Sequence, residues 1–285
     1  MKVKAIIFGT CRIHDSAHLI HKTGCFDLVD SPLNHYVHTS SEICQYLRYI
    51  TGDLRIETDW VDLVYSQKHN KPVYSKINHH SIPAQLSSTT GSQNYSDIKN
   101  VDVAIVEIST LRRYRFNSLF FQENCINYYL QENSGLSIRE DHQVRDLFET
   151  PPSSRLEPKT NNQVLNQILS NCIAEYMTES DIENDLRFIK SIFPKVIILS
   201  HFTAASMPPA VLESRQKLQI MIEKLSQTLG IKWFSVSDLI KQMPPQDQLL
   251  SQGDFNHYSE KSKQLIASKL AKFVIQNHSN IIGCF

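Results

Sequence analysis

The sequence predicts an α/β protein of three layers, α/β/α, in which helices cover both faces of a mostly parallel, doubly wound sheet. Short apolar runs typical of buried strands occur at 3–8, 101–108, 195–200 and 232–236. Longer segments with helical spacing lie among them, at 181–193, 213–229 and 259–276. Strands that alternate with helices favour parallel pairing through right-handed connections, and such sheets bind ligands at the carboxyl ends of their strands.

Each predicted helix is supported by a separate feature of the sequence. In 181–193 the apolar residues Ile182, Leu186, Ile189 and Ile192 recur at helical spacing. Gly230 follows 213–229 and is expected to cap that helix at its C-terminus. The segment 259–276 has one continuous apolar stripe, and a further helix is expected after the first strand, from about Ser16.

One large domain spanning 1–285 is the preferred organisation, although two small domains would also fit this length. The segment 112–166 breaks the alternation of strands and helices, because it is polar, rich in aromatic and arginine residues, and interrupted by prolines. We interpret it as an insertion that could form a lid over the site. The segment 53–91 is irregular and receives no assignment.

The charge balance and the cysteine content limit which binding partners and which cellular compartment are expected. Lys plus Arg equals Asp plus Glu at 29 each, so no excess of positive charge favours nucleic acid or an anionic membrane as the main partner. The N-terminal apolar run is too short for a signal peptide or a membrane span. The six cysteines show neither a C-x-x-C pair nor zinc spacing, which favours free thiols in a cytoplasmic protein without a bound metal. The sequence does not indicate the oligomeric state.

Cys11 lies where the first strand turns into the next helix, after Gly9 and Thr10. Free backbone N–H groups at a helix start stabilise a thiolate, and the same groups can hold an oxyanion. Arg12 would add to this positive field and lower the pKa of Cys11 further. The alternative is that Cys11 is simply a small buried apolar residue.

The second candidate group lies just before the last helix, where Asp254 and His257 have D-x-x-H spacing. This spacing lets the carboxylate accept from one ring nitrogen while the other faces a nucleophile. His257 would then act as general base toward Cys11 and as general acid toward the leaving group. In the alternative interpretation Asp254 or Asn256 caps the helix and His257 is an ordinary surface residue.

These two motifs resemble the SGNH/GDSL hydrolases, particularly the atypical members with a G-S-C-like first block. Cys11 matches the serine nucleophile of that family, Thr10 matches its aspartate, and Asp254 and His257 match its D-x-x-H block. The segments 101–107 and 233–239 resemble further strands of the family, so the likeness covers most of the chain outside 112–166. The resemblance implies the fold, a Cys-His-Asp triad and acyl-ester chemistry without a cofactor.

The sequence departs from the family at the oxyanion hole. After Glu107 the chain continues Ile108-Ser109-Thr110, so the expected asparagine is missing and Ser109 or Thr110 would have to donate instead. Gly91 could match the glycine of the second family block, whose backbone N–H contributes to the hole.

Other polar residues follow strands of the same predicted sheet. His201 comes after 195–200 and could contact substrate or replace His257, although a packing role is the commoner one. Glu107 ends the strand 101–108, where burial would raise its pKa unless an arginine, for which Arg112 is the natural candidate, pairs with it. Arg112 also begins a patch that could bind an anionic group or form a solvated face.

The sequence therefore predicts an SGNH-like esterase, thioesterase or O-acyltransferase that acts on a small-molecule or carbohydrate ester. Two other hypotheses remain at this stage. One is a binding protein that keeps the fold without turnover, and the other is a cysteine hydrolase of amide or isopeptide bonds.

Overall fold

The computed structural model describes residues 2–24, 26–29, 36–56, 60, 98–155, 160–204, 206–251 and 254–277. The chain divides into two compact units. Unit 1 comprises Met1–Ser40, Ser96–Thr110 and Glu183–Phe285. Unit 2 comprises Ser41–Tyr95 and Leu111–Ile182.

Unit 1 is built on a five-stranded sheet with the order β2-β1-β3-β7-β8. Its strands are β1 (Val3–Phe8), β2 (Phe26–Leu28), β3 (Val103–Glu107), β7 (Val196–Leu199) and β8 (Lys232–Phe234). Every neighbouring pair is parallel. The order is that of a doubly wound sheet, 2-1-3-4-5, in which the direction of winding reverses beside the first strand. The predicted fold class is therefore confirmed.

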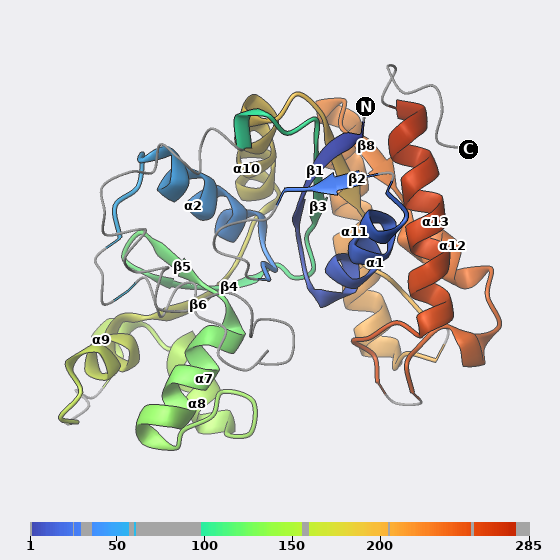
Figure 1. Cartoon of the computed structure of the whole chain (residues 1–285). Helices are drawn as coiled ribbons and strands as arrows, with labels where there is room; N and C mark the ends of the chain where they lie inside the picture. The colour runs from blue at the N-terminus through green and yellow to red at the C-terminus, as the bar shows by residue number, and fades with distance from the viewer. Residues whose placement is uncertain are drawn as a thin grey trace. The chain divides into compact units, whose positions relative to one another are not determined.

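Helices cover both faces of this sheet (Figure 1). On one face lie α1 (Cys11–Lys22) and α13 (Glu260–Asn277), which pack against each other, and on the other lie α10 (Glu179–Ile192) and α11 (Pro209–Leu229). Right-handed connections explain the division, because the chain moves one way from β1 to β2 and the opposite way from β7 to β8.

Side chains of β1 alternate between the two faces. Ala5 and Ile7 join the core cluster that contains Ala17 of α1 and Leu270 of α13. Phe8, on the other face, contacts Phe193 just after α10, with ring centroids 5.8 Å apart. Burial on both faces is the reason why the strands of the sheet are short, almost continuous apolar runs.

The helix ends agree with the sequence in one case and differ in another. Gly230 caps α11 with φ 62°, as expected of a glycine at this position. The first helix begins at Cys11 and not near Ser16, so the thiol is on its first residue. The sequence interpretation also omitted β2, α2 (Ser40–Thr51) and α12 (Val236–Lys241).

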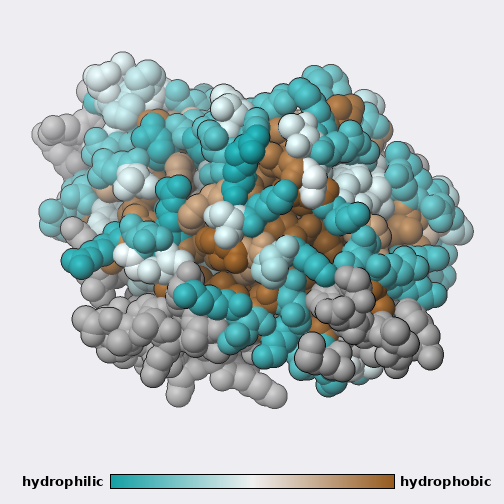
Figure 2. Space-filling view, turned by 90° about the horizontal axis from the view of Figure 1, so that it is seen from above, coloured by the Kyte–Doolittle hydropathy of each residue, from teal (hydrophilic) through white to brown (hydrophobic). Residues whose placement is uncertain are grey.

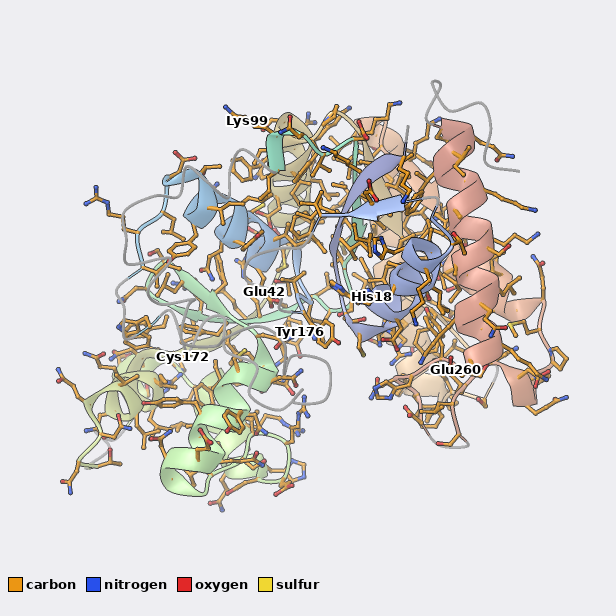
Figure 3. All side chains as sticks on the ribbon, in the orientation of Figure 1. His18, Glu42, Lys99, Cys172, Tyr176 and Glu260 are labelled. Carbon is orange, nitrogen blue, oxygen red and sulfur yellow. The ribbon has the colours of Figure 1, made fainter. Side chains whose placement is uncertain are left out.

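Unit 2 contains a three-stranded antiparallel sheet with the order β5-β4-β6. The strands are β4 (Arg112–Phe116), β5 (Leu119–Phe121) and β6 (Ile173–Tyr176), accompanied by α7 (Glu123–Ser134), α8 (His142–Glu149), η1 (Pro152–Ser154) and α9 (Gln163–Asn171). Buried Cys172 precedes β6 and exposed Tyr176 ends it (Figure 3). The segment 112–166 lies within this unit and forms regular secondary structure in its described parts, and its role as a lid stays a prediction.

The surface mixes polar and apolar residues, with hydrophilic side chains spread widely in the view of Figure 2. None of the helices in the described ranges is long and apolar enough to cross a membrane.

Candidate active site

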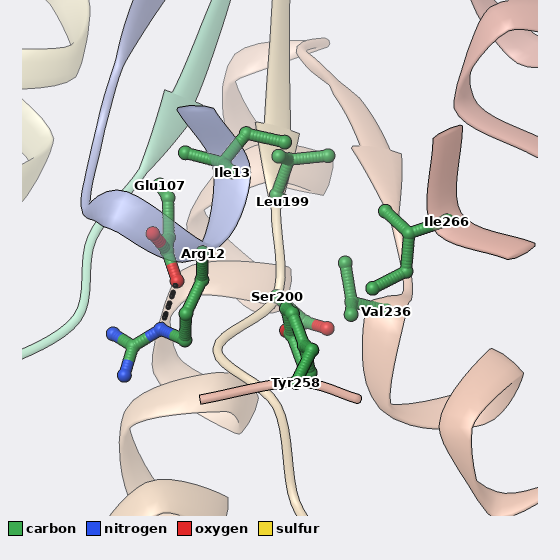
Figure 4. Close-up of a pocket in the computed structure, with 8 residues that line it drawn as sticks. All are labelled: Arg12, Ile13, Glu107, Leu199, Ser200, Val236, Tyr258 and Ile266. Atoms are coloured by element: carbon green, nitrogen blue, oxygen red, sulfur yellow. Dashed lines mark hydrogen bonds and ion pairs between the residues drawn. The ribbon is translucent and has the colours of Figure 1, made fainter. Parts of the chain in front are cut away.

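Glu107 is the centre of a buried polar network at the carboxyl edge of the unit 1 sheet. It ends β3 and is 2% exposed. One carboxylate oxygen accepts from the Thr10 backbone N–H at 3.0 Å and from its hydroxyl at 2.6 Å. The other oxygen accepts from Arg12 Nε at 3.2 Å (Figure 4). These bonds tie the first turn of α1 to the end of β3.

Gly9 lets this network form, because the turn after β1 passes against Glu107. A Cβ on Gly9 would lie 2.6 Å from Ile13 Cγ2 and 2.9 Å from Glu107 Cβ. Both distances are too short for any side chain. The glycine of the Gly-Thr-Cys motif is thus required by close packing around the glutamate.

The ionisation of Glu107 differs from the expectation. Burial alone would raise its pKa, but the Arg12 charge and the hydrogen bonds of the network hold the pKa of Glu107 well below its usual range. Glu107 is consequently a fixed anion and not a second general acid. The predicted pairing with Arg112 was also wrong, since Arg112 pairs with Glu149 at 3.1 Å in unit 2.

His201 follows β7 and is 4% exposed. Its Nδ1 lies 3.7 Å from Glu107 Oε1, too far for a hydrogen bond, and has no hydrogen-bond partner among the described residues. Burial, aided by the charge of Arg12, lowers the pKa of His201 to about 3. The ring is therefore neutral at physiological pH and serves as a packed polar group beside the network.

Cys11 is a free thiol on the first residue of α1, and it is partly exposed. The expected lowering of its pKa was wrong. Burial raises the pKa of Cys11, and the lowering influence of Arg12 is opposed by the nearby Glu107 carboxylate. Sequence reasoning had counted the helix start and Arg12 but not the buried anion that Arg12 accompanies. A reaction at this thiol would accordingly need a base.

Asp254 and His257 form a close pair. His257 Nδ1 lies 2.9 and 3.1 Å from the two Asp254 carboxylate oxygens. The same carboxylate accepts from the backbone N–H groups of Asn256 and His257, at 2.9 and 3.1 Å. The hydrogen bonds from these groups outweigh burial and lower the pKa of Asp254. The His257 side chain is half exposed, which leaves the ring accessible from solvent.

The two motifs are joined through residues next to them in the sequence. Arg12 Nη1 donates to the Asn256 backbone oxygen at 3.5 Å, so the residue after Cys11 is bonded to the residue before His257. Cys11 itself makes no hydrogen bond to His257 in the described structure.

Sequence reasoning missed three residues around this junction, namely Phe202, Arg215 and Tyr258, and considered Asn256 only as a possible helix cap. Arg12 and Arg215 both lie over the Phe202 ring, with centroid distances of 5.5 and 4.9 Å. Asn256 and Tyr258 flank His257 and could have been suspected from that position alone. Nothing in the helical pattern of 213–229 distinguished Arg215 from the other polar residues of its helix.

A small cavity lies beside the network, with room for about one water molecule. Arg12, Glu107, Ser200 and Tyr258 contribute polar atoms to its lining (Figure 4). Burial raises the pKa of Tyr258 well above its usual value, so its hydroxyl stays protonated and can donate a hydrogen bond.

Two of the predicted oxyanion donors, Ser109 and Thr110, make hydrogen bonds to His38. Ser109 Oγ lies 3.0 Å from His38 Nδ1, and the backbone N–H groups of Ser109 and Thr110 both donate to the His38 oxygen. Gly91 lies outside the described residues. Across the ranges that the structure describes, no group of three or more histidine, cysteine or acidic side chains could hold a metal ion.

The strand order defines a doubly wound α/β protein with a polar network at the carboxyl edge of its sheet. Residues 3–273 match the model of the TviD N-terminal domain, and the chain belongs to that family.

Several solved structures with a partial likeness to this chain align with nearly its whole length. A carbohydrate acetylesterase from Sinorhizobium meliloti is 11% identical, with a TM-score of 0.38 and coverage of 97% of this chain and 100% of its own. An α/β hydrolase enzyme from the metagenome of Lake Arreo, Spain, is 12% identical, with a TM-score of 0.43 and 99% coverage of both chains. A catalytic mutant of an acetylxylan esterase from Geobacillus stearothermophilus is 8% identical, with a TM-score of 0.40 and coverage of 95% and 94%. A search of curated proteins found no match.

Proposed function

We propose that this protein cleaves or transfers acyl groups of esters through Cys11, His257 and Asp254. The observation that carries the proposal is the junction between the two motifs. Asp254 holds His257 through Nδ1, and Arg12, the neighbour of Cys11, bonds to Asn256, the neighbour of His257. This junction supports the proposal, because nucleophilic acyl chemistry requires an oriented imidazole within reach of the thiol.

In the proposed first half-reaction Cys11 Sγ attacks the acyl carbonyl while His257 Nε2 takes the thiol proton. A C–S bond forms, and the carbonyl electrons become a tetrahedral oxyanion. When the intermediate collapses, the ester C–O bond breaks and His257 returns the proton to the departing alkoxide. This leaves a thioester on Cys11 and an alcohol product.

In the second half-reaction an acceptor hydroxyl attacks the thioester, with His257 again removing the proton. Water as acceptor releases a carboxylic acid, and a sugar hydroxyl yields a new ester. Both routes return the proton to Cys11. The raised pKa of Cys11 makes the base essential, because few thiols would ionise at neutral pH without one.

The oxyanion would be held by backbone N–H groups at the start of α1, with Gly91 and the Ser109-Thr110 segment as further proposed donors. The proposed substrate is a small-molecule or carbohydrate ester, and a role of Arg112 and of the segment 112–166 in binding it stays a prediction. No cofactor takes part in this scheme.

A binding protein without turnover is the second candidate, and a specific observation favours it. The pKa of Cys11 is raised by burial and by the neighbouring Glu107 anion, which is the reverse of what activates a nucleophilic cysteine.

The test uses chromogenic short-chain esters and thioesters, with anilides as the amide arm. Cys11→Ala and His257→Ala are expected to lower kcat/KM by roughly 10³-fold or more, as removal of triad members does. His18→Ala, an exposed histidine on the same helix as Cys11, is the control and should behave as wild type. Turnover equal in wild type and both triad variants, or absent altogether, would exclude the proposed site and favour the binding protein.

A further inference from the structure

Asn256 is an exposed loop residue that makes three hydrogen bonds to other residues. Its backbone N–H donates to Asp254 Oδ1 at 2.9 Å, and its backbone oxygen accepts from Arg12 Nη1 at 3.5 Å. Its side-chain Oδ1 accepts from Arg215 Nη2 at 3.2 Å. Three different residues therefore bond to Asn256. One of them, Arg215, lies on α11, which carries no residue of the predicted triad.

Arg215 is itself held in place. Its guanidinium lies 4.9 Å from the centroid of Phe202, a ring that is fully buried, and Nη1 lies 3.5 Å from Met207 Sδ. Cation–π packing of this kind restricts an otherwise flexible side chain. The bond to Asn256 thus connects the D-x-x-H segment to a rigid part of the core.

The charge of Arg215 interacts with the Glu107 carboxylate, which favours its protonated form. Among the described residues it forms no ion pair, and burial together with the charge of Arg12 lowers its pKa to about 10. It remains protonated at neutral pH, so its hydrogen bond to the Asn256 amide oxygen is charge-assisted and stronger than a neutral one.

We infer that Arg215 is a positioning residue, which through Asn256 orients the segment 254–257 and with it the His257 ring. This inference rests on the proposed function for its catalytic meaning. Arg12 bonds to the backbone oxygen of Asn256 and Arg215 to its side-chain oxygen, so one arginine fixes the backbone and the other the side chain of the same residue. Neither arginine needs to touch the substrate for this purpose.

Kinetics of a double-mutant cycle test the inference. Arg215→Ala and Asn256→Ala should each lower kcat about tenfold with little change in KM, the loss expected for one charge-assisted hydrogen bond. The double variant should be no slower than the worse single variant, because both remove the same bond. Asn256→Asp keeps the acceptor oxygen and should restore kcat to within about twofold of wild type. If the fold-losses in kcat of the two single variants multiply in the double variant, the inference is overturned.

Lys217→Ala is the matched control. Lys217 lies on the same helix, is exposed, and pairs with Glu213 rather than with the 254–257 segment. Its kcat should equal that of wild type. An equal loss in Lys217→Ala and Arg215→Ala would mean that the helix, and not the bond to Asn256, is responsible.

Hydrogen exchange separates failure of this inference from failure of the proposed function. The backbone amides of Asn256 and His257 both donate to Asp254, so they should exchange about tenfold faster in Arg215→Ala and at the wild-type rate in Lys217→Ala. Unchanged exchange in Arg215→Ala would reject the inference whatever the activity. Absence of ester turnover in the wild type, with faster exchange in Arg215→Ala, would reject the proposed function and leave Arg215 as the residue that holds this segment.

Discussion

Both units place arginine beside glutamate, but at very different depths. In unit 1 the side chains of Arg12 and Glu107 are 7% and 3% exposed. In unit 2 Glu175 is 24% exposed and accepts from two arginines of the neighbouring strand, Arg113 at 2.7 Å and Arg115 at 3.1 Å. Charges that water can still reach are partly compensated when a partner is lost, whereas a buried charge is not. The unit 1 pair should therefore govern stability, while the unit 2 pairs should add little.

The largest effect is expected from Glu107→Gln. The substitution keeps the size of the side chain but leaves the Arg12 charge buried without an anion, which costs about 3–5 kcal/mol of unfolding free energy. Urea unfolding at pH 7 measures it. A loss of unfolding free energy below about 1 kcal/mol would contradict the expected difference between the buried pair of unit 1 and the more exposed pairs of unit 2.

An intermediate effect is expected from pH through His201, whose pKa is about 3 in the folded chain against an ordinary histidine value of 6.5. Between these values the unfolded chain binds the proton and the folded chain does not, so stability falls as pH decreases below about 6.5. Between pH 7 and pH 5 this amounts to about 2 kcal/mol.

The variant His201→Gln should remove that share of the pH dependence in urea unfolding. Some dependence of the same sign will remain, because burial also lowers the pKa of His14, to about 4. Identical pH profiles for wild type and His201→Gln would contradict the neutral, buried state of this ring.

The smallest effect is expected from Glu175→Gln, which serves as the matched partner of Glu107→Gln. Solvent screens the charges of Arg113 and Arg115, and the unfolding free energy should fall by about 1 kcal/mol or less. The same urea titration measures it, and added salt should reduce the difference further. A loss as large as that of Glu107→Gln would remove the distinction between the units.

The sheet of unit 1 was largely predictable because its strands are buried on both faces and so appear as apolar runs. The strand β2 was not, since three residues carry too little pattern. The antiparallel sheet of unit 2 was missed for another reason. Its strand β4 has the sequence Arg-Arg-Tyr-Arg-Phe, in which Arg113 and Arg115 pair with Glu175 on β6, a strand that lies far along the chain.

The candidate site, like the fold, was predictable from the sequence only in part. Cys11, Asp254 and His257 could be named from motifs and their places beside predicted elements, and as a triad they stay a prediction. The partner of Glu107 was predicted wrongly as Arg112, because local sequence does not show that the fold brings Arg12 of the first helical turn to the end of β3.

The sequence by itself determined most strands of the doubly wound sheet and the Asp-His pair, because local periodicity and short spacing encode them. Only the tertiary structure decided the ionisation of Glu107, the raised pKa of Cys11 and the hold of Arg215 on Asn256. Each of these depends on burial and on charges brought together from distant parts of the chain, and neither burial nor such proximity is written in local sequence.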